Sequence, residues 1–145
     1  MTDQWGRRLF TIGGVWLLLM GAVHSLSFFV KQTATNDTER QLLDLMANYK
    51  FNLMGSLRSM DNLMTGFSIS FMLAALVLGA LALVLRSQPG PLLKRVAFVY
   101  SVWLALMTAV SLHYFFVIPI SFLSVGLIIF VLATFKLPAQ SPPTA

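Results

Sequence analysis

Four stretches of this sequence are almost entirely apolar, and each is long enough to cross a bilayer as a helix. They run from about residue 9 to 30, 62 to 85, 96 to 116 and 119 to 135. About 20 apolar residues span a hydrocarbon core about 30 Å thick. Lipid offers the backbone no hydrogen-bond partner, so such stretches fold as helices. The sequence predicts an all-α fold, namely a four-transmembrane-helix bundle.

The composition excludes the other broad classes. Hydrophobic residues make up 57% of the 145 residues and charged residues only 10%, whereas soluble domains are about half apolar and a quarter charged. So few charges cannot cover a soluble surface, and so much apolar character excludes a disordered chain. The absence of cysteine excludes disulfides and thiolate chemistry. No basic run is interleaved with aromatic residues, so we expect the lipid bilayer as surroundings and no nucleic-acid partner.

The third and fourth stretches are separated by no charged residue. Together they cover 40 residues, from Val96 to Phe135, and a single helix of that length would measure roughly 60 Å, twice the core thickness. Pro119 is the only proline among them, and proline is well tolerated in a first helical turn. We therefore predict a turn near residues 114–118, with Pro119 opening the fourth helix. A single kinked helix is the alternative.

Positive charge sets the predicted orientation. If the N-terminus is cytoplasmic, six basic residues lie on the inner side and four on the outer side. The inner residues are Arg7, Arg8, Arg86, Lys94, Arg95 and Lys136, and the outer residues are Lys31, Arg40, Lys50 and Arg58. We expect a multi-pass protein of the plasma (inner) membrane with both termini in the cytoplasm. A signal peptide is the alternative for the first stretch, but the run is longer than the usual apolar region of such peptides.

The outer loop between the first two spans contains an amphipathic segment, at about residues 38–58. Its apolar residues recur at steps of three and four, as on one side of a helix: Leu42, Met46, Tyr49, Leu53 and Leu57. Asn36 with Glu39, or Thr38 with Gln41, fits a capping box at its start. This additional helix either lies in the outer interface and caps the bundle, or binds a partner. We expect residues 1–137 to form a single membrane domain and residues 138–145 a disordered, proline-rich tail.

Small residues repeat at four-residue spacing on two spans. Gly66, Ser70 and Ala74 form one row, and Gly21 and Ser25 form another. Such rows allow transmembrane backbones to approach closely. We expect them to pack helices inside one bundle, with homodimerisation through the same row as the alternative.

The clear ionisable residues inside the predicted spans are His24 and His113. Both lie toward the outer face, at a depth similar to that of Asp61 and Asn62 at the start of the second span. Intramembrane ionisable residues are candidates for function, and two imidazoles could hold haem, a metal ion or a quinone headgroup. The structural alternative is that each histidine hydrogen-bonds a backbone carbonyl or a nearby hydroxyl, for which Ser25, Ser27, Ser68 and Ser111 are available. The spacing shows no recognised metal motif.

A short run that opens the second span carries a family resemblance. The run Gly66-Phe67-Ser68 is followed by Phe71, and the first span contains Gly21 and His24. In these features the chain resembles small uncharacterised bacterial four-helix integral membrane proteins. The resemblance implies a four-helix fold, and it implies neither an established activity nor a catalytic residue.

The functional expectation follows from what the spans lack. The sequence contains no nucleophile elbow, P-loop or dinucleotide-binding glycine motif, and no acidic residue lies in the middle of a span. We therefore expect a non-enzymatic membrane component without a cofactor, acting through helix–helix association with itself or with another membrane protein. The alternatives are a redox or ligand-binding module that uses His24 and His113, and a small transporter or channel subunit.

Overall fold

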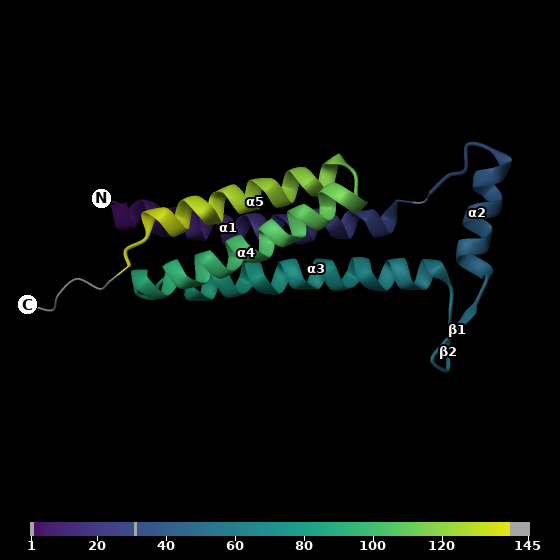
Figure 1. Ribbon diagram of the computed structural model, residues 1–145, viewed down its shortest axis with the longest axis horizontal. Coiled ribbons are helices and arrows are strands. Elements are labelled where there is room, and N and C mark those ends of the chain that lie inside the picture. The colour runs from purple at the N-terminus through teal and green to yellow at the C-terminus, as the bar shows by residue number, and fades with distance from the viewer. Residues whose placement is uncertain (1, 31, 140–145) are drawn as a thin grey trace, which may run out of the picture. The chain divides into compact units, whose positions relative to one another are not determined.

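The structure is a computed structural model that describes residues 2–30 and 32–139, and the chain divides into two compact units (Figure 1). One unit comprises Met1–Met20 and Ala75–Ala145, and the other comprises Gly21–Ala74. The helices are α1 (Thr2–Ser25), α2 (Asp37–Asn48), α3 (Met60–Leu85), α4 (Gly90–Tyr114) and α5 (Val117–Lys136). A short 3-10 helix, η1 (Leu26–Phe29), continues α1, and two strands, β1 (Phe51–Leu53) and β2 (Ser56–Arg58), precede α3.

Four helical segments are long and apolar enough to cross a membrane: Asp3–Phe29, Met60–Leu85, Gly90–Tyr114 and Val117–Lys136. Each coincides with one of the four predicted stretches to within about six residues at either end. The mainly helical content agrees with the all-α prediction. The predicted turn between the last two spans is confirmed, since α4 ends at Tyr114, α5 begins at Val117 and the two helices pack together. Pro119 is the third residue of α5, where its missing N–H breaks no helical bond.

The core of the first unit is built around three aromatic rings. The ring of Phe130 on α5 meets Phe10 on α1 edge-on at 5.8 Å and Tyr100 on α4 at 4.9 Å between centroids. Edge-to-face pairs of this kind contribute about 0.5–1.5 kcal/mol beyond their buried area. The Tyr100 hydroxyl donates to the carbonyl of Leu78 on α3 at 2.9 Å, and the indole N–H of Trp16 donates to an α5 carbonyl at 2.9 Å. The first bond links α4 to α3, and the second links α1 to α5.

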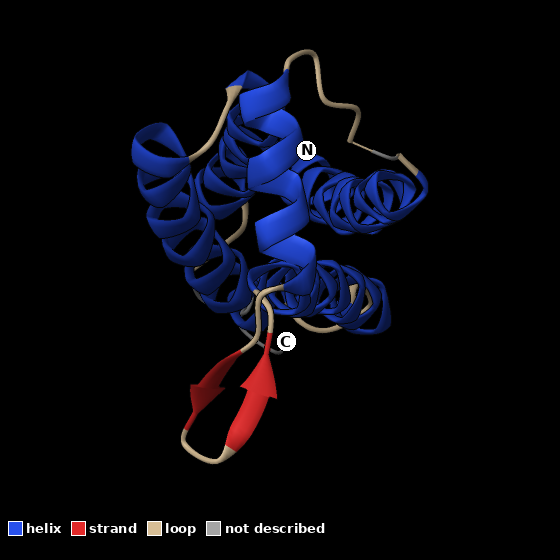
Figure 2. Cartoon of the chain, turned by 90° about the vertical axis from the view of Figure 1, so that its right-hand side faces the viewer, coloured by secondary structure: helices blue, strands red, loops and turns tan. Residues whose placement is uncertain are grey.

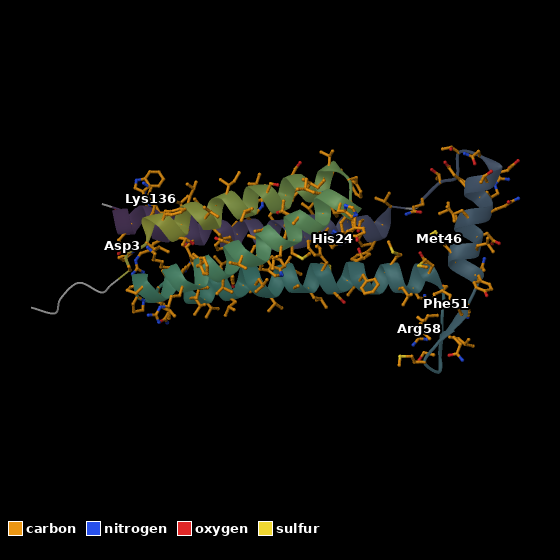
Figure 3. The ribbon with its side chains drawn as sticks, viewed as in Figure 1. Asp3, His24, Met46, Phe51, Arg58 and Lys136 are labelled. Atoms are coloured by element: carbon orange, nitrogen blue, oxygen red, sulfur yellow. The ribbon has the colours of Figure 1, made fainter. Side chains whose placement is uncertain are left out.

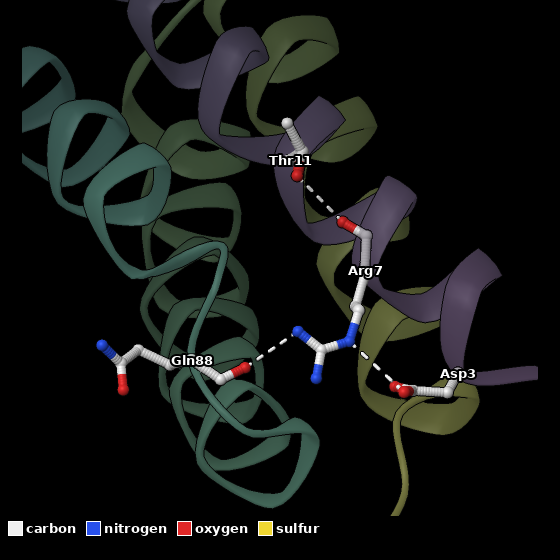
Figure 4. A network of polar contacts seen from close by, with 4 residues as sticks. All are labelled: Asp3, Arg7, Thr11 and Gln88. Carbon is white, nitrogen blue, oxygen red and sulfur yellow. Dashed lines mark hydrogen bonds and ion pairs between the residues drawn. The ribbon is translucent and has the colours of Figure 1, made fainter.

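Charged side chains of the first unit gather where α1 begins. Arg7 forms an ion pair with Asp3 at 3.3 Å, and its guanidinium donates to the carbonyl of Gln88 in the turn between α3 and α4 at 2.9 Å (Figure 4). A β-carbon placed on Gly6 would lie 2.8 Å from the side chain of Leu137, just after α5. The beginning of α1, the α3–α4 turn and the end of α5 therefore lie together in this unit.

The second unit begins its amphipathic part as the sequence predicts. Asn36 is the N-cap of α2, and its side chain accepts from the N–H of Glu39 at 2.9 Å. The Glu39 carboxylate accepts from both the N–H and the hydroxyl of Thr35, each at 2.7 Å. Of the two predicted capping boxes, the structure contains the one formed by Asn36 and Glu39, with the carboxylate bonded one residue earlier than in the standard box.

The prediction of a helix as far as residue 58 is wrong, because α2 ends at Asn48 and a β-hairpin follows (Figure 2). Strand β1 pairs with β2 in antiparallel register, with Phe51 opposite Arg58. The two-residue loop has φ of 49° at Met54 and 90° at Gly55. Positive φ at both positions is the geometry of the type I′ turn that hairpins favour. Glycine adopts positive φ at little steric cost, so Gly55 favours this turn. The turn ends the helical pattern.

The predicted disordered tail, residues 138–145, falls mostly outside the described residues. Of its positions, Pro138 and Ala139 are described, and neither belongs to a helix or strand. A β-carbon on Gly90 at the start of α4 would lie 2.5 Å from Pro138. The chain after α5 therefore lies against the start of α4 at Pro138.

Candidate functional site

Helix α3 carries two rows of small residues on different sides of the helix. Ala75, Gly79 and Ala82 are its buried residues, whereas Gly66, Ser70 and Ala74 are all exposed. A helix turns by about 100° per residue, so Gly79 lies roughly 140° around the axis from Gly66. The predicted row of Gly66, Ser70 and Ala74 is therefore the open side of α3, and the packing inside the first unit uses the other row.

The buried row brings the backbones of α3 and α1 close together in the first unit. A β-carbon on Gly79 would lie 2.8 Å from the carbonyl oxygen of Gly14 and from the backbone nitrogen of Leu18, both on α1. A β-carbon on Gly14 would lie 2.8 Å from the β-carbon of Ala82. Only glycine fits at these two positions without moving backbone, so this pair acts as the packing contact that small-residue rows provide in membranes.

The open row borders a groove. A β-carbon on Gly66 would meet no atom within 4 Å, and an open groove of about 590 Å³ lies over this position. Its lining residues are Arg58, Asn62, Leu63, Gly66, Phe67 and Ser70. The Ser70 hydroxyl donates to the carbonyl of Gly66 at 2.9 Å, so its hydrogen bond is made within α3 and the hydroxyl adds little width to this face.

The second predicted row, on α1, is differently placed. Gly21 is buried and Ser25 is partly exposed. The Ser25 hydroxyl donates to the carbonyl of Ala22 at 2.6 Å, inside its own helix. This bond closes the last turn of α1 before η1 begins, so Ser25 has a local role at the helix end.

His24 is held within the second unit by a hydroxyl and two aromatic rings. Its Nε2 lies 2.8 Å from the hydroxyl oxygen of Ser68 on α3. Its ring meets Phe71 edge-on at 5.1 Å and Phe28 at 6.2 Å between centroids. Of the four hydroxyls that the structural alternative named, that of Ser68 is the one bonded to His24. This bond links the end of α1 to α3 and gives the polar ring of His24 a hydrogen-bond partner.

His113 belongs to the first unit, whereas His24 belongs to the second. It lies in the last turn of α4, exposed, with its ring 4.5 Å from that of Tyr114. In residues 2–30 and 32–139, no group of three or more His, Cys, Asp or Glu side chains is placed to hold a metal ion. A shared His24–His113 site for haem, a metal or a quinone stays a prediction.

Asp61 and Asn62, the predicted polar pair, lie in the first turn of α3 and are exposed. The side-chain oxygen of Asn62 accepts from the N–H of Ser59 at 3.4 Å, and the Asn62 N–H donates to the buried Ser59 hydroxyl at 3.2 Å. This reciprocal pair caps α3 and fixes where the span begins. The three-residue spacing from Ser59 to Asn62 is typical of such a cap. The motifs discussed above predicted neither this cap nor a role for the groove residues Arg58, Leu63 and Phe67.

Comparison of the chain with protein-family models, with curated proteins and with solved structures finds no match. The resemblance of the Gly66-Phe67-Ser68 run to small bacterial four-helix membrane proteins therefore stays a prediction. The functional argument rests on the geometry of α3 and of the residues around it.

Proposed function

We propose that this protein is a non-enzymatic, multi-pass membrane component that acts by helix–helix association, with a second copy of itself as the partner. The observation that carries the proposal is the pair of small-residue rows on α3. One row, at Gly79, already packs α3 against α1; the other is also made of small residues, and a β-carbon on its Gly66 would meet no atom within 4 Å.

The open row suits a second transmembrane helix because association in lipid depends on close packing. Lipid tails are as apolar as leucine, so exposed apolar side chains gain nothing by leaving them. A row of small residues instead lets a second backbone come close enough for extensive van der Waals contact. From Gly66 to Ala74 the row extends about 12 Å along the helix axis, which is long enough for a helix crossing.

We further propose that both termini face the cytoplasm, in the plasma membrane of a bacterium. Six basic residues against four favour this orientation. The contact between Gly6 and Leu137 supports placing the start of α1 and the end of α5 on one side. A reporter fused after Ala145 is expected to be active in the cytoplasm, and a tag at Thr35 is expected to be accessible from outside. The reverse pattern contradicts the orientation.

The association is tested with Gly66→Leu and the matched control Thr65→Leu. Both residues are exposed on α3, but Thr65 lies about 100° around the helix from Gly66. Subunits are counted by single-molecule photobleaching of labelled protein diluted in lipid bilayers. We expect wild type and Thr65→Leu to form dimers and Gly66→Leu to be monomeric. Dimers that persist in Gly66→Leu, or a monomeric wild type, refute the proposed contact; a complex with only a different membrane protein refutes the choice of partner.

A further inference from the structure

The groove on α3 has a polar mouth. Arg58 is the last residue of β2 (Figure 3), and one of its guanidinium nitrogens donates to the carbonyl of Leu57 at 2.8 Å. Across the described part of the chain, no carboxylate lies within ion-pair distance of Arg58; the ion pairs found there are Asp3–Arg7 and Asp37–Arg40. Asn62 uses its side-chain oxygen for the cap of α3, so its NH₂ group is the part left to donate. The mouth thus offers a cation and an amide donor.

Beyond its mouth the groove follows the span, and its lining there includes Leu63, Gly66, Phe67 and Ser70. Asn62, Gly66 and Ser70 recur at four-residue intervals and share one side of α3, over about 12 Å of helix axis. Gly66 forms the floor, and Leu63 and Phe67 complete the lining beside it. Because α3 is one of the four candidate spans, the groove starts at the polar end of a transmembrane helix and runs toward the hydrocarbon core.

We propose that this groove binds a phospholipid with a net negative headgroup. The phosphate is bound by the Arg58 guanidinium and the Asn62 amide, and one acyl chain lies over Gly66 beside Phe67. Guanidinium groups bind phosphate through parallel, charge-assisted hydrogen bonds. A soluble anion at Arg58 and Asn62 would leave the apolar lining residues Leu63 and Phe67 uncovered. A second protein helix at the mouth would have to bury the unpaired charge of Arg58, which is costly without a partner carboxylate.

The lipid and the association proposed above share part of α3. Gly66 and Ser70 belong to both surfaces, Arg58 lines only the groove, and Ala74 belongs only to the association row. Lipid in the groove and a second copy therefore compete for the outer half of the row. The shared positions cannot distinguish the two proposals, whereas Arg58 and Ala74 can.

Lipid binding is measured by native mass spectrometry on delipidated protein in neutral detergent, titrated with phosphatidylglycerol or phosphatidylcholine. We expect phosphatidylglycerol to bind more tightly, and Arg58→Gln to weaken its binding about tenfold or more, as loss of a charge-assisted hydrogen bond implies. The control Arg40→Gln removes another exposed arginine, which pairs with Asp37, and is expected to leave binding unchanged. Equal binding of the two lipids, or equal effects of the two arginine variants, overturns the proposal.

Two further arms separate this site from a simple anion site and from the association face. Glycerol phosphate, the headgroup without its chains, is expected not to displace the lipid at the same concentration; displacement shows an anion site and refutes a lipid site. Ala74→Leu is expected to abolish dimers while lipid binding persists, and Arg58→Gln to weaken lipid binding while dimers persist. If Arg58→Gln instead abolishes dimers and leaves lipid binding intact, the groove is a protein interface and the lipid proposal is wrong.

Discussion

Gly79 and Gly66, the two glycines of α3, lie in opposite surroundings. The same substitution should therefore change the free energy of unfolding in opposite directions at the two positions. At Gly79 an added β-carbon would lie 2.8 Å from the Gly14 oxygen, the Leu18 nitrogen and the Leu18 γ-carbon. Two of these three atoms are backbone, so relief requires α1 and α3 to separate. At Gly66 the added carbon meets no atom within 4 Å.

The magnitude follows from comparing Gly79→Ala with Gly66→Ala. Alanine gains about 0.5–1 kcal/mol over glycine inside a helix, and this gain is common to both variants. Overpacking a well-packed site costs about 1–3 kcal/mol, and only Gly79→Ala incurs it. The free energy of unfolding should therefore be about 1–3 kcal/mol lower for Gly79→Ala than for Gly66→Ala, with Gly66→Ala equal to or slightly above wild type.

The free energies are measured by titrating denaturing detergent into mixed micelles, with the protein dilute enough to be monomeric. Tryptophan fluorescence reports unfolding, because the Trp16 ring stacks on Phe122 at 5.3 Å in the folded unit. A Gly79→Ala variant as stable as Gly66→Ala would refute the close approach of α1 and α3 at Gly14.

Three other predictions concern local contacts. Tyr100→Phe removes the hydroxyl that donates to Leu78 and is expected to lower the free energy of unfolding by about 0.5–1.5 kcal/mol in the same titration. The bonds from Thr35 hold the pKa of Glu39 below its ordinary value of 4.5, so they stabilise the start of α2 above pH 4.5 and are lost as the pH falls through the lowered pKa; circular dichroism should show helix loss in acid that Glu39→Gln does not show. Met54→Asn places a residue that tolerates positive φ in the hairpin turn, and cross-strand proton contacts in NMR should strengthen.

The spans and their turn could be predicted because each depends on a local property of the sequence. Length and hydropathy define the four stretches, and the uninterrupted run from Val96 to Phe135 is too long for one crossing. The start of α2 was likewise predictable from Asn36 and Glu39, since a cap needs residues only three positions apart. These features require no knowledge of what lies elsewhere in the fold.

The hairpin was missed because its apolar residues satisfy two patterns at once. Tyr49, Leu53 and Leu57 fit the helical spacing of α2, and the pattern therefore concealed the turn at Met54 and Gly55. Gly55 distinguishes the helix from the hairpin, because glycine is unfavourable inside an amphipathic helix and favoured in a two-residue turn.

The two rows on α3 show what spacing alone cannot determine. Gly66, Ser70 and Ala74 have the spacing of a packing row, and so do Ala75 and Gly79. Which row faces another helix depends on how α3 is turned relative to α1, which is set by contacts such as Gly14 with Gly79. The sequence contains both rows and does not indicate which of them packs against another helix.

The account's central claim is that the open row of α3 is a contact with a second copy, and cysteine cross-linking tests it most directly. The chain contains no cysteine, so a single Ser70→Cys reports on that position alone, and Leu132→Cys on the exposed side of α5 is the matched control. In native membranes under mild oxidation we predict a disulfide-linked dimer for Ser70→Cys and monomer for Leu132→Cys. Equal cross-linking at both positions, or none at Ser70→Cys, would contradict the claim.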